Sequence, residues 1–182
     1  MAGRLIAIVG PSGVGKDSVM EALAKAHPRL GLVKRVITRP KGLGGEDYEP
    51  VSTTEFESRK ARGAFALDWP AHGLLYGIPK TVHDDLANGQ DLLANLSRAV
   101  LPAAQKAFPD LVTLRLTASD ATLRARLSGR GRETAEDIEQ RLKRADFPMP
   151  AGVTYTDLSN DGAIDETIAA ALAVLYSEDV LT

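Results

Sequence analysis

A glycine-rich segment with a lysine directly follows the first apolar run of the sequence. Residues 10–16 read Gly-Pro-Ser-Gly-Val-Gly-Lys and fit the pattern G-x-x-x-x-G-K. In this pattern the glycines let successive backbone N–H groups turn toward phosphate oxygens, the next helix adds partial positive charge at its N-terminus, and the lysine reaches the terminal phosphates. The segment therefore predicts a phosphate-binding loop for a nucleoside triphosphate.

The residue after this pattern departs from the usual form. A Ser or Thr whose hydroxyl binds Mg²⁺ is usual there, whereas this chain has Asp17, a carboxylate that can hold Mg²⁺ directly or through water. Asp17 is therefore the candidate magnesium ligand, since Ser18 points about 100° further round the helix. We expect ATP and Mg²⁺ as cofactors, with the nucleotide bound by Gly10, Pro11, Ser12, Gly13, Val14, Gly15, Lys16, Asp17 and Ser18.

A group of arginines near the segment Ser128-Gly-Arg-Gly131 predicts a second functional element. Glycines beside arginines are typical of a lid that closes over a transferring phosphoryl group and excludes water. The group comprises Arg124, Arg126, Arg130, Arg132 and Arg141. We take Arg130 and Arg141 as the preferred catalytic pair together with Lys16. The alternative is a solvated helix face on which these arginines pair with Glu133, Glu136 and Asp137.

A second basic group, Lys34, Arg35, Arg39 and Lys41, lies between the second apolar run and a glycine-rich loop. Basic residues gathered near a phosphate loop in a net acidic chain indicate an anionic acceptor, because their mutual repulsion needs compensation. Ordinary surface charge is the alternative. A switch GTPase would carry a guanine-reading N-K-x-D segment, which this sequence lacks. The combination therefore favours a kinase.

The composition of the chain argues against several classes of partner and site. The chain has 182 residues and a net charge of −2, which argues against a dedicated nucleic-acid partner. It has no cysteine, and its three histidines are too dispersed to suggest a metal triad. The longest apolar stretch, Ile168 to Tyr176, is about half of a membrane span, so no membrane partner is expected. We expect a cytoplasmic protein acting on a small molecule, and the sequence leaves its oligomeric state open.

The elements that must position these residues alternate between strand and helix. Buried strands are expected at 5–9, 32–37, 91–96, 111–116 and 153–158, and helices at 17–26, from 53, at 79–88, from 99, from 120, at 134–145 and at 164–176. Ser52 with Glu55, and Thr134 with Asp137, have the spacing of helix capping pairs. This alternation predicts an α/β fold with a mostly parallel sheet that carries helices on both faces.

A single P-loop kinase domain is the expected organisation. Its core should comprise about 1–38, 81–127 and 136–182, with an acceptor-binding insertion at about 39–80 and a short lid at about 128–135.

Over nearly its whole length the sequence resembles the guanylate-kinase branch of P-loop phosphotransferases. Besides the loop, the matching pieces are Thr38-Arg-Pro, Gly45-Glu-Asp-Tyr48, Val51-Ser-x-x-Glu-Phe56, Gly63-Ala-Phe65, His72-Gly-x-x-Tyr-Gly77, Arg130-Gly131, Ile138-x-x-Arg-Leu142 and Ser159-Asn-Asp161. The resemblance implies that Arg39, Tyr48 and Tyr76 hold the acceptor phosphate. It also implies that Arg130 and Arg141 serve the transferred phosphate.

The positions that would read guanine differ from those of guanylate kinases. The resemblance implies a small hydroxyl, a glutamate and an aspartate there, but this chain has Arg35, Leu67 and Ser97, so the local formal charge changes from −2 to +1. GMP is therefore a poor acceptor, because a buried donor left unpaired costs about 1 to 3 kcal/mol.

These departures resemble the ribose 1,5-bisphosphate phosphokinases of bacterial phosphonate catabolism. The shared segments are Lys16-Asp-Ser18, Val36-Ile-Thr-Arg-Pro40, Phe65-Ala-Leu67, Ala71-His-Gly73 and Asn95-x-Ser-Arg98. The resemblance implies that ATP and ribose 1,5-bisphosphate give ADP and 5-phosphoribosyl 1-diphosphate. We expect Arg35 and Arg98 to bind the remaining phosphate or the ribose hydroxyls, with Ser97 as a further substrate-binding residue.

Three alternatives stay open at this point. The first is a guanylate kinase with altered base contacts. The second is a kinase acting on a hydroxyl, for which Asp68 or Asp91 would be the catalytic base. The third is a guanylate-kinase-like binding module without catalysis, which the intact glycines and lysine of the loop disfavour.

Overall fold

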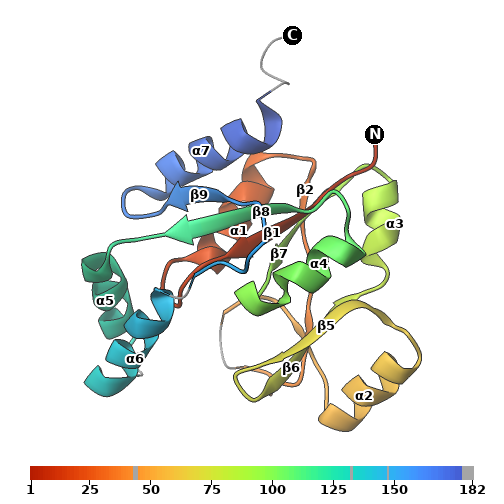
Figure 1. Ribbon diagram of the computed structural model, residues 1–182, viewed down its shortest axis with the longest axis horizontal. Coiled ribbons are helices and arrows are strands. Elements are labelled where there is room, and N and C mark those ends of the chain that lie inside the picture. Colours follow the sequence, from red (N-terminus) through yellow and green to blue (C-terminus); the bar gives the residue numbers. More distant parts are fainter. Residues whose placement is uncertain (43–44, 132, 147, 178–182) are drawn as a thin grey trace.

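Five parallel strands form the central layer of the protein (Figure 1). The computed structural model describes residues 1–42, 45–131, 133–146 and 148–177. The strand order is β2 (Leu30–Leu32), β7 (Asp91–Asn95), β1 (Leu5–Val9), β8 (Val112–Thr117), β9 (Thr156–Ser159). The expected α/β fold with a mostly parallel sheet is therefore confirmed.

The residues of β1 alternate between two hydrophobic clusters, one on each face of this sheet. Ile6 and Ile8 belong to the cluster that includes residues of α1 (Lys16–Ala26), α5 (Asp120–Gly129), α6 (Ala135–Ala145) and α7 (Ile164–Tyr176). Leu5, Ala7 and Val9 belong to the cluster that includes residues of α3 (Val82–Ala87) and α4 (Leu101–Ala107). Period-two alternation in a strand that is buried on both faces thus places helices on both sides of the sheet.

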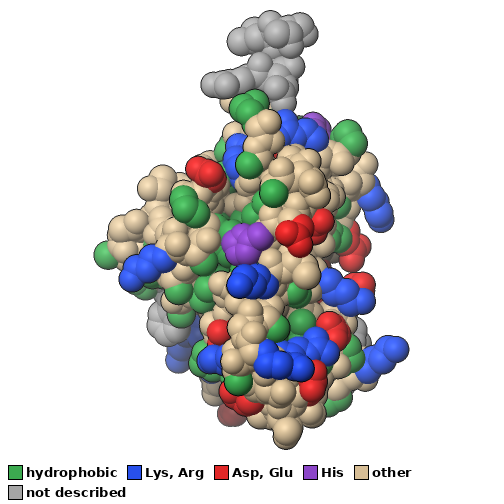
Figure 2. Space-filling model, turned by 90° about the vertical axis from the view of Figure 1, so that its right-hand side faces the viewer, with side chains coloured by type: hydrophobic (Ala, Val, Ile, Leu, Met, Phe, Trp, Pro, Cys, Tyr) green, Lys and Arg blue, Asp and Glu red, His purple; other side chains and the backbone are tan. Residues whose placement is uncertain are grey.

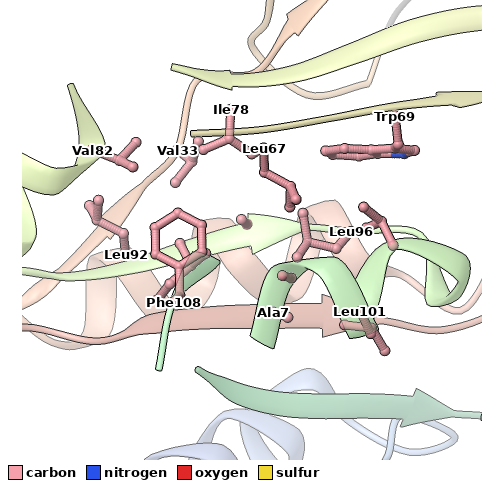
Figure 3. Close-up of a cluster of buried hydrophobic side chains, with 14 of the residues drawn as sticks. Ala7, Val33, Leu67, Trp69, Ile78, Val82, Leu92, Leu96, Leu101 and Phe108 are labelled. Carbon is pink, nitrogen blue, oxygen red and sulfur yellow. The ribbon is translucent and has the colours of Figure 1, made fainter. Parts of the chain in front are cut away.

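A second sheet lies against the α3 and α4 face and includes strands from the segment 39–80, which the sequence predicts to bind the acceptor. Its order is β4 (Glu49–Pro50), β3 (Val36–Ile37), β6 (Leu74–Pro79), β5 (Phe65–Ala71), and α2 (Thr53–Ala61) connects β4 to β5. Figure 3 shows Leu67 and Trp69 from β5 and Ile78 from β6 facing Leu92 and Leu96 of the parallel-sheet side. This apolar contact fixes the second sheet relative to the phosphate loop.

Several expected boundaries are wrong. The apolar run 32–37 is not one strand: the N–H of Val33 still donates to the carbonyl of Leu93 (2.9 Å), but the carbonyl of Arg35 accepts from Glu49 (2.8 Å), so the chain changes sheets here. The helix expected from residue 79 begins at Val82, because Pro79 is the last residue of β6. The last strand begins at residue 156 rather than 153.

The hairpin of β5 and β6 was not anticipated as a pair of strands. Its turn is formed by His72 and Gly73, with φ of 51° and 73°, which is the geometry of a tight hairpin connection. Pro70 in β5 masks the strand pattern, but β5 is an edge strand, where a missing N–H donor is tolerated.

Both predicted capping pairs are at helix N-termini. The Ser52 hydroxyl accepts from the N–H of Glu55 at 3.1 Å, and Thr134 with Asp137 forms a complete capping box. None of the helices in the described residues is long and apolar enough to cross a membrane.

Charged side chains of both signs alternate over the α2 end of the molecule, in the lower part of Figure 2. On this end Arg59 pairs with Glu55 at 2.7 Å and with Glu49 at 2.8 Å. Arg59 thus balances the charge of two half-buried carboxylates.

Candidate active site

The glycine-rich loop wraps the start of α1. Gly15 is the N-cap of α1 in the left-handed region, with φ of 96°, and its carbonyl accepts from the N–H of Val19 at 3.0 Å. A Cβ on Gly15 would lie 2.8 Å from the side-chain nitrogen of Asn160. Glycine is therefore required here both by the backbone conformation and by this close approach. This arrangement leaves the N-terminus of α1 able to bind an anion.

Residues distant in sequence hold the loop in place. The carbonyl of Val14 accepts from Arg126 Nη1 at 3.0 Å and from Asn160 Nδ2 at 2.7 Å. Arg126 also donates to the carbonyl of Asn160 at 2.7 Å, and Thr167 donates to Asn160 Oδ1 at 2.8 Å. Arg126, grouped in the sequence with the lid, thus supports the loop.

Lys16 carries a positive charge that its surroundings disfavour. Its amino group donates to the carbonyls of Gly10 at 2.8 Å and Pro11 at 3.1 Å. Burial lowers the pKa of Lys16 to about 8; Asp17 opposes this shift, while Arg35, Arg98 and Arg130 reinforce it. An incoming anionic phosphate would relieve this unfavourable electrostatic interaction.

Helices α5 and α6, which flank the segment 128–135 expected to form the lid, bring arginines near the loop. Arg141 of α6 donates to the Ser12 hydroxyl at 2.6 Å and pairs with Glu133 at 3.0 Å. Arg130 is the C-cap of α5 and contributes to the field at Lys16. The Arg141–Glu133 pair is one that the surface alternative anticipated, whereas Arg124 pairs with Glu139, which that alternative did not name. Arg132 lies outside the described residues.

On the acceptor side, Arg35 is buried, with 6 % of its surface exposed. Its Nε donates to Glu46 Oε2 at 2.8 Å, its Nη2 donates to Glu46 Oε1, and its Nη1 donates to the carbonyl of Asn95 at 2.8 Å. Its guanidinium also lies over the ring of Tyr76, 4.9 Å from the centroid. The structure thus brings Arg35 and Tyr76 together, with Glu46 as the counter-ion.

Arg39 lies beside this pair and retains hydrogen-bonding capacity. Its guanidinium lies 4.3 Å from the centroid of the Tyr48 ring, and Tyr48 donates its hydroxyl proton to the carbonyl of Pro40 at 2.6 Å. Nη2 of Arg39 is 3.8 Å from a carboxylate oxygen of Glu46. Within the described part of the chain, Nε of Arg39 is buried and lacks a hydrogen-bond partner. Arg39 can therefore donate to a ligand.

Ser97 and Arg98 follow β7. Ser97 is the N-cap of the 3₁₀ helix η1 (Arg98–Val100). Arg98 donates to the carbonyls of Arg144 at 2.6 Å and Ala145 at 3.4 Å, and it lines a cavity of about 310 Å³ beside the start of the loop. Its guanidinium thus contacts the C-terminal end of α6.

Asp17 connects the loop to the acceptor side. Asn95 donates its side-chain amide to Asp17 Oδ1 at 3.3 Å, while its backbone carbonyl accepts from Arg35. Ser18, in the same first turn of α1, is exposed. No cluster of three or more potential metal ligands occurs in the described ranges. One carboxylate beside a phosphate loop fits Mg²⁺ that is held mainly by nucleotide oxygens.

Neither alternative catalytic base is arranged for that task. Asp91 begins β7, at the opposite end of that strand from Asn95, and its side chain is fully buried. It accepts from Arg4 and from the Tyr176 hydroxyl. Asp68 pairs with Lys60 of α2 at 2.7 Å.

Sequence reasoning missed three supporting residues, Glu46, Asn95 and Asn160. Each lies in a segment that carries the family resemblance, but position in a motif does not identify a contact. Glu46 had one usable signal, because a carboxylate among clustered basic residues is the expected counter-charge.

Comparisons with known proteins agree with this geometry. The sequence model described as "Guanylate kinase" matches residues 2–177. A "Ribose 1,5-bisphosphate phosphokinase PhnN" of Ruegeria sp. (strain TM1040) is 48% identical over 97% of this chain and 93% of that protein. A protein of the same name from Pseudomonas fluorescens (strain SBW25) is 45% identical over 96% of each chain.

A solved structure extends the comparison to the fold. The crystal structure of guanylate kinase from Anaplasma phagocytophilum superposes with a TM-score of 0.70 at 21% identity, covering 100% of this chain and 88% of that one.

Proposed function

The chain belongs to the guanylate kinase family and, within it, to the ribose 1,5-bisphosphate phosphokinases, and on this premise we propose that it transfers the γ-phosphoryl group of ATP to ribose 1,5-bisphosphate. The products are ADP and 5-phosphoribosyl 1-diphosphate. The observation that carries the acceptor assignment is the buried Arg35, which lies where the resemblance to guanylate kinases implies a hydroxyl that reads the base. A guanidinium has no acceptor for the ring N–H and amino group of guanine.

The proposed reaction requires no general base. An oxygen of the 1-phosphate, already anionic at neutral pH, forms a new bond to the γ-phosphorus of ATP. The bond from that phosphorus to the bridging oxygen breaks, and ADP leaves with the electron pair. Catalysis then consists of positioning the two phosphates and neutralising their charge.

On the donor side, the loop from Gly10 to Ser18 holds the nucleotide phosphates, and Lys16 reaches the β and γ groups. Arg141 already contacts Ser12 of the loop, so a small movement brings its guanidinium onto the transferred phosphoryl group. Arg130 adds positive charge to the same region, in agreement with its effect on the pKa of Lys16.

On the acceptor side, Arg39, Tyr48 and Tyr76 hold one phosphate. For this the Tyr48 hydroxyl exchanges its hydrogen bond to the Pro40 carbonyl for one to a phosphate oxygen. The Nε of Arg39, which has no hydrogen-bond partner among the residues that the structure describes, supports this assignment, because a phosphate oxygen would satisfy it. Arg35, Ser97 and Arg98 lie on the same side of the site. The contacts of Arg35 with Glu46, and of Arg98 with the end of α6, restrict the part that each arginine can play in binding.

Mg²⁺ bound with the nucleotide supplies charge neutralisation on the phosphate oxygens. Asp17 would hold it directly or through water, and Asn95 orients that carboxylate. Because ATP is a cytoplasmic metabolite, we propose that the enzyme acts in the cytoplasm.

Phosphorus NMR tests the proposal directly. The protein is incubated with Mg-ATP and either ribose 1,5-bisphosphate or GMP. We expect new diphosphate signals from the sugar and none above background from GMP. A Lys16→Ala variant, checked for folding by circular dichroism, should give roughly 10³-fold slower turnover as the matched control. Efficient formation of GDP, with no product from the sugar, would contradict the acceptor assignment.

A further inference from the structure

Glu46 lies between the two arginines of the acceptor side. Its side chain is 16% exposed, and both of its carboxylate oxygens contact Arg35. One of these oxygens is also 3.8 Å from Nη2 of Arg39. The charge of Arg35 is thus already balanced inside the protein, and all three of its nitrogens have partners. These contacts use three of the five N–H donors of the guanidinium, so Glu46 and Asn95 fix its orientation, and the Glu46 counter-charge weakens its attraction for a second phosphate.

The carboxylate of Glu46 still has unused acceptor capacity. A carboxylate offers about four lone-pair sites, and Arg35 takes two of them while Arg39 approaches a third. A ligand group that meets this carboxylate must donate a hydrogen bond, because an anionic phosphate oxygen would be repelled. A sugar hydroxyl is such a donor.

Arg39 provides the complementary half of the site. Its buried Nε lacks a hydrogen-bond partner among the described residues, and its guanidinium is held over the Tyr48 ring. A donor directed to phosphate and an acceptor directed to hydroxyl thus lie side by side. Nη2 of the same guanidinium lies 3.8 Å from Glu46 Oε1, and this spacing suits one ligand that carries a phosphate and a hydroxyl on neighbouring carbon atoms.

We propose that Glu46 accepts a hydrogen bond from a ribose hydroxyl of the acceptor and thereby selects a hydroxylated sugar phosphate. Arg35 is then a positioning residue, which acts by holding the Glu46 carboxylate. This inference rests on the proposed function and assigns the hydroxyl contact within it. It also explains why a basic acceptor site contains a carboxylate, which would weaken binding if it faced only phosphate.

The test compares three acceptors: ribose 1,5-bisphosphate and its 2-deoxy and 3-deoxy analogues. Values of kcat and KM are measured for the unmodified protein, Glu46→Gln, Glu46→Ala and the control Glu49→Gln. Glu49 lies three residues further along and pairs with Arg59 of α2, so its replacement removes a nearby carboxylate outside the site. Circular dichroism and thermal melting confirm that each variant is folded.

The unmodified protein should disfavour at least one deoxy analogue by about tenfold or more in kcat/KM, since the analogue leaves Glu46 without its donor. Both Glu46 variants should reduce this preference to about threefold or less, mainly through a higher KM for the natural acceptor. Glu49→Gln should keep the full preference.

Two results would overturn the inference while leaving the proposed function intact. One is turnover by the unmodified protein without any preference among the three acceptors, or with a preference that survives in both Glu46 variants. The other is a lower acceptor KM in Glu46→Ala, which would mean that the carboxylate competes with phosphate. If the unmodified protein phosphorylates none of the three acceptors, the proposed function itself fails and the inference fails with it.

Discussion

Two groups of charged residues lie at opposite ends of the parallel sheet. In one group the surroundings stabilise the charged form of a buried side chain, and in the other they destabilise it. The first, called here the anchor cluster, consists of Arg4, Asp91 and Tyr176 and lies where β1 and β7 begin. Burial raises the pKa of Asp91, but hydrogen bonds from Arg4 and Tyr176 outweigh burial and hold the pKa below its usual value. The surroundings of this carboxylate therefore stabilise its charged form.

The second group surrounds Lys16 at the carboxyl ends of the same strands. Burial lowers the pKa of Lys16, and the positive charges of Arg35, Arg98 and Arg130 add to this effect. Here the surroundings destabilise the charged form in the absence of an anion. The difference shows which end of the sheet is built for structure and which end is prepared for a ligand that brings negative charge.

The largest effect should come from breaking the anchor cluster. In Asp91→Asn the Arg4 guanidinium loses its counter-ion and the Tyr176 hydroxyl loses a charged acceptor. Breaking a fully buried pair costs about 3 to 5 kcal/mol of unfolding free energy. Because the Arg4 side chain is 32% exposed, we expect a loss of about 3 kcal/mol, the lower end of that range, which urea denaturation would measure. Turnover per folded molecule should be unchanged, because Asp91 lies away from the phosphate loop.

The exposed pair of Arg115 with Asp157 supplies a control, since the Asp157 side chain is 49% exposed. Asp157→Asn should cost about 1 kcal/mol or less. Equal losses for the two variants would show that Asp91 is no more structural than a surface carboxylate.

The sequence predicted local features better than contacts between distant segments. The phosphate loop was predictable because its chemistry lies within residues 10–18, where spacing alone brings the groups together. The hydrophobic periodicity predicted the parallel sheet for the same local reason. The run 32–37 was misread because its apolar pattern does not show that the chain leaves one sheet for another between Val33 and Arg35.

The acceptor side was only partly predictable. Arg35, Glu46 and Asn95 meet from three separate segments, and no spacing rule specifies which carboxylate neutralises which arginine. The sequence therefore predicted a basic acceptor site but not that Glu46 balances the charge of Arg35. The positive charge of Arg98 was likewise evident from the sequence, but its contact with α6 is visible only in the folded structure.

A pH titration sharpens the contrast at the ligand end. With a pKa of about 8, Lys16 is charged below that pH and loses its proton above it. Bound phosphate favours the charged form, so the Kd for ATP should weaken by about tenfold per pH unit above pH 8, as measured by calorimetry. ATP binding at pH 8.5 should also take up protons, which titrations in buffers of different ionisation enthalpy detect.

The stability of the ligand-free protein should respond with the opposite sign. Between about pH 8 and the ordinary lysine value of 10.5, the unfolded chain holds a proton on Lys16 that the folded chain has lost. Stability from this group therefore rises with pH over that window. The rise should be absent in Lys16→Met, and an ATP affinity independent of pH up to 9.5 would show that the charge at Lys16 is not disfavoured.

The smallest expected effect on catalysis comes from Arg98, which connects the end of β7 near Lys16 to helix α6. Its guanidinium donates to the last carbonyls of α6, the helix whose Arg141 contacts Ser12 of the loop. If Arg98 acts by positioning α6, Arg98→Ala should lower kcat by about five- to tenfold, on the order of 1 kcal/mol, and leave the acceptor KM nearly unchanged. If Arg98 instead binds the sugar phosphate directly, as we expected from the sequence, the acceptor KM should rise while kcat changes little. Lys106→Ala, on the adjacent helix α4, is a control for the removal of a basic side chain.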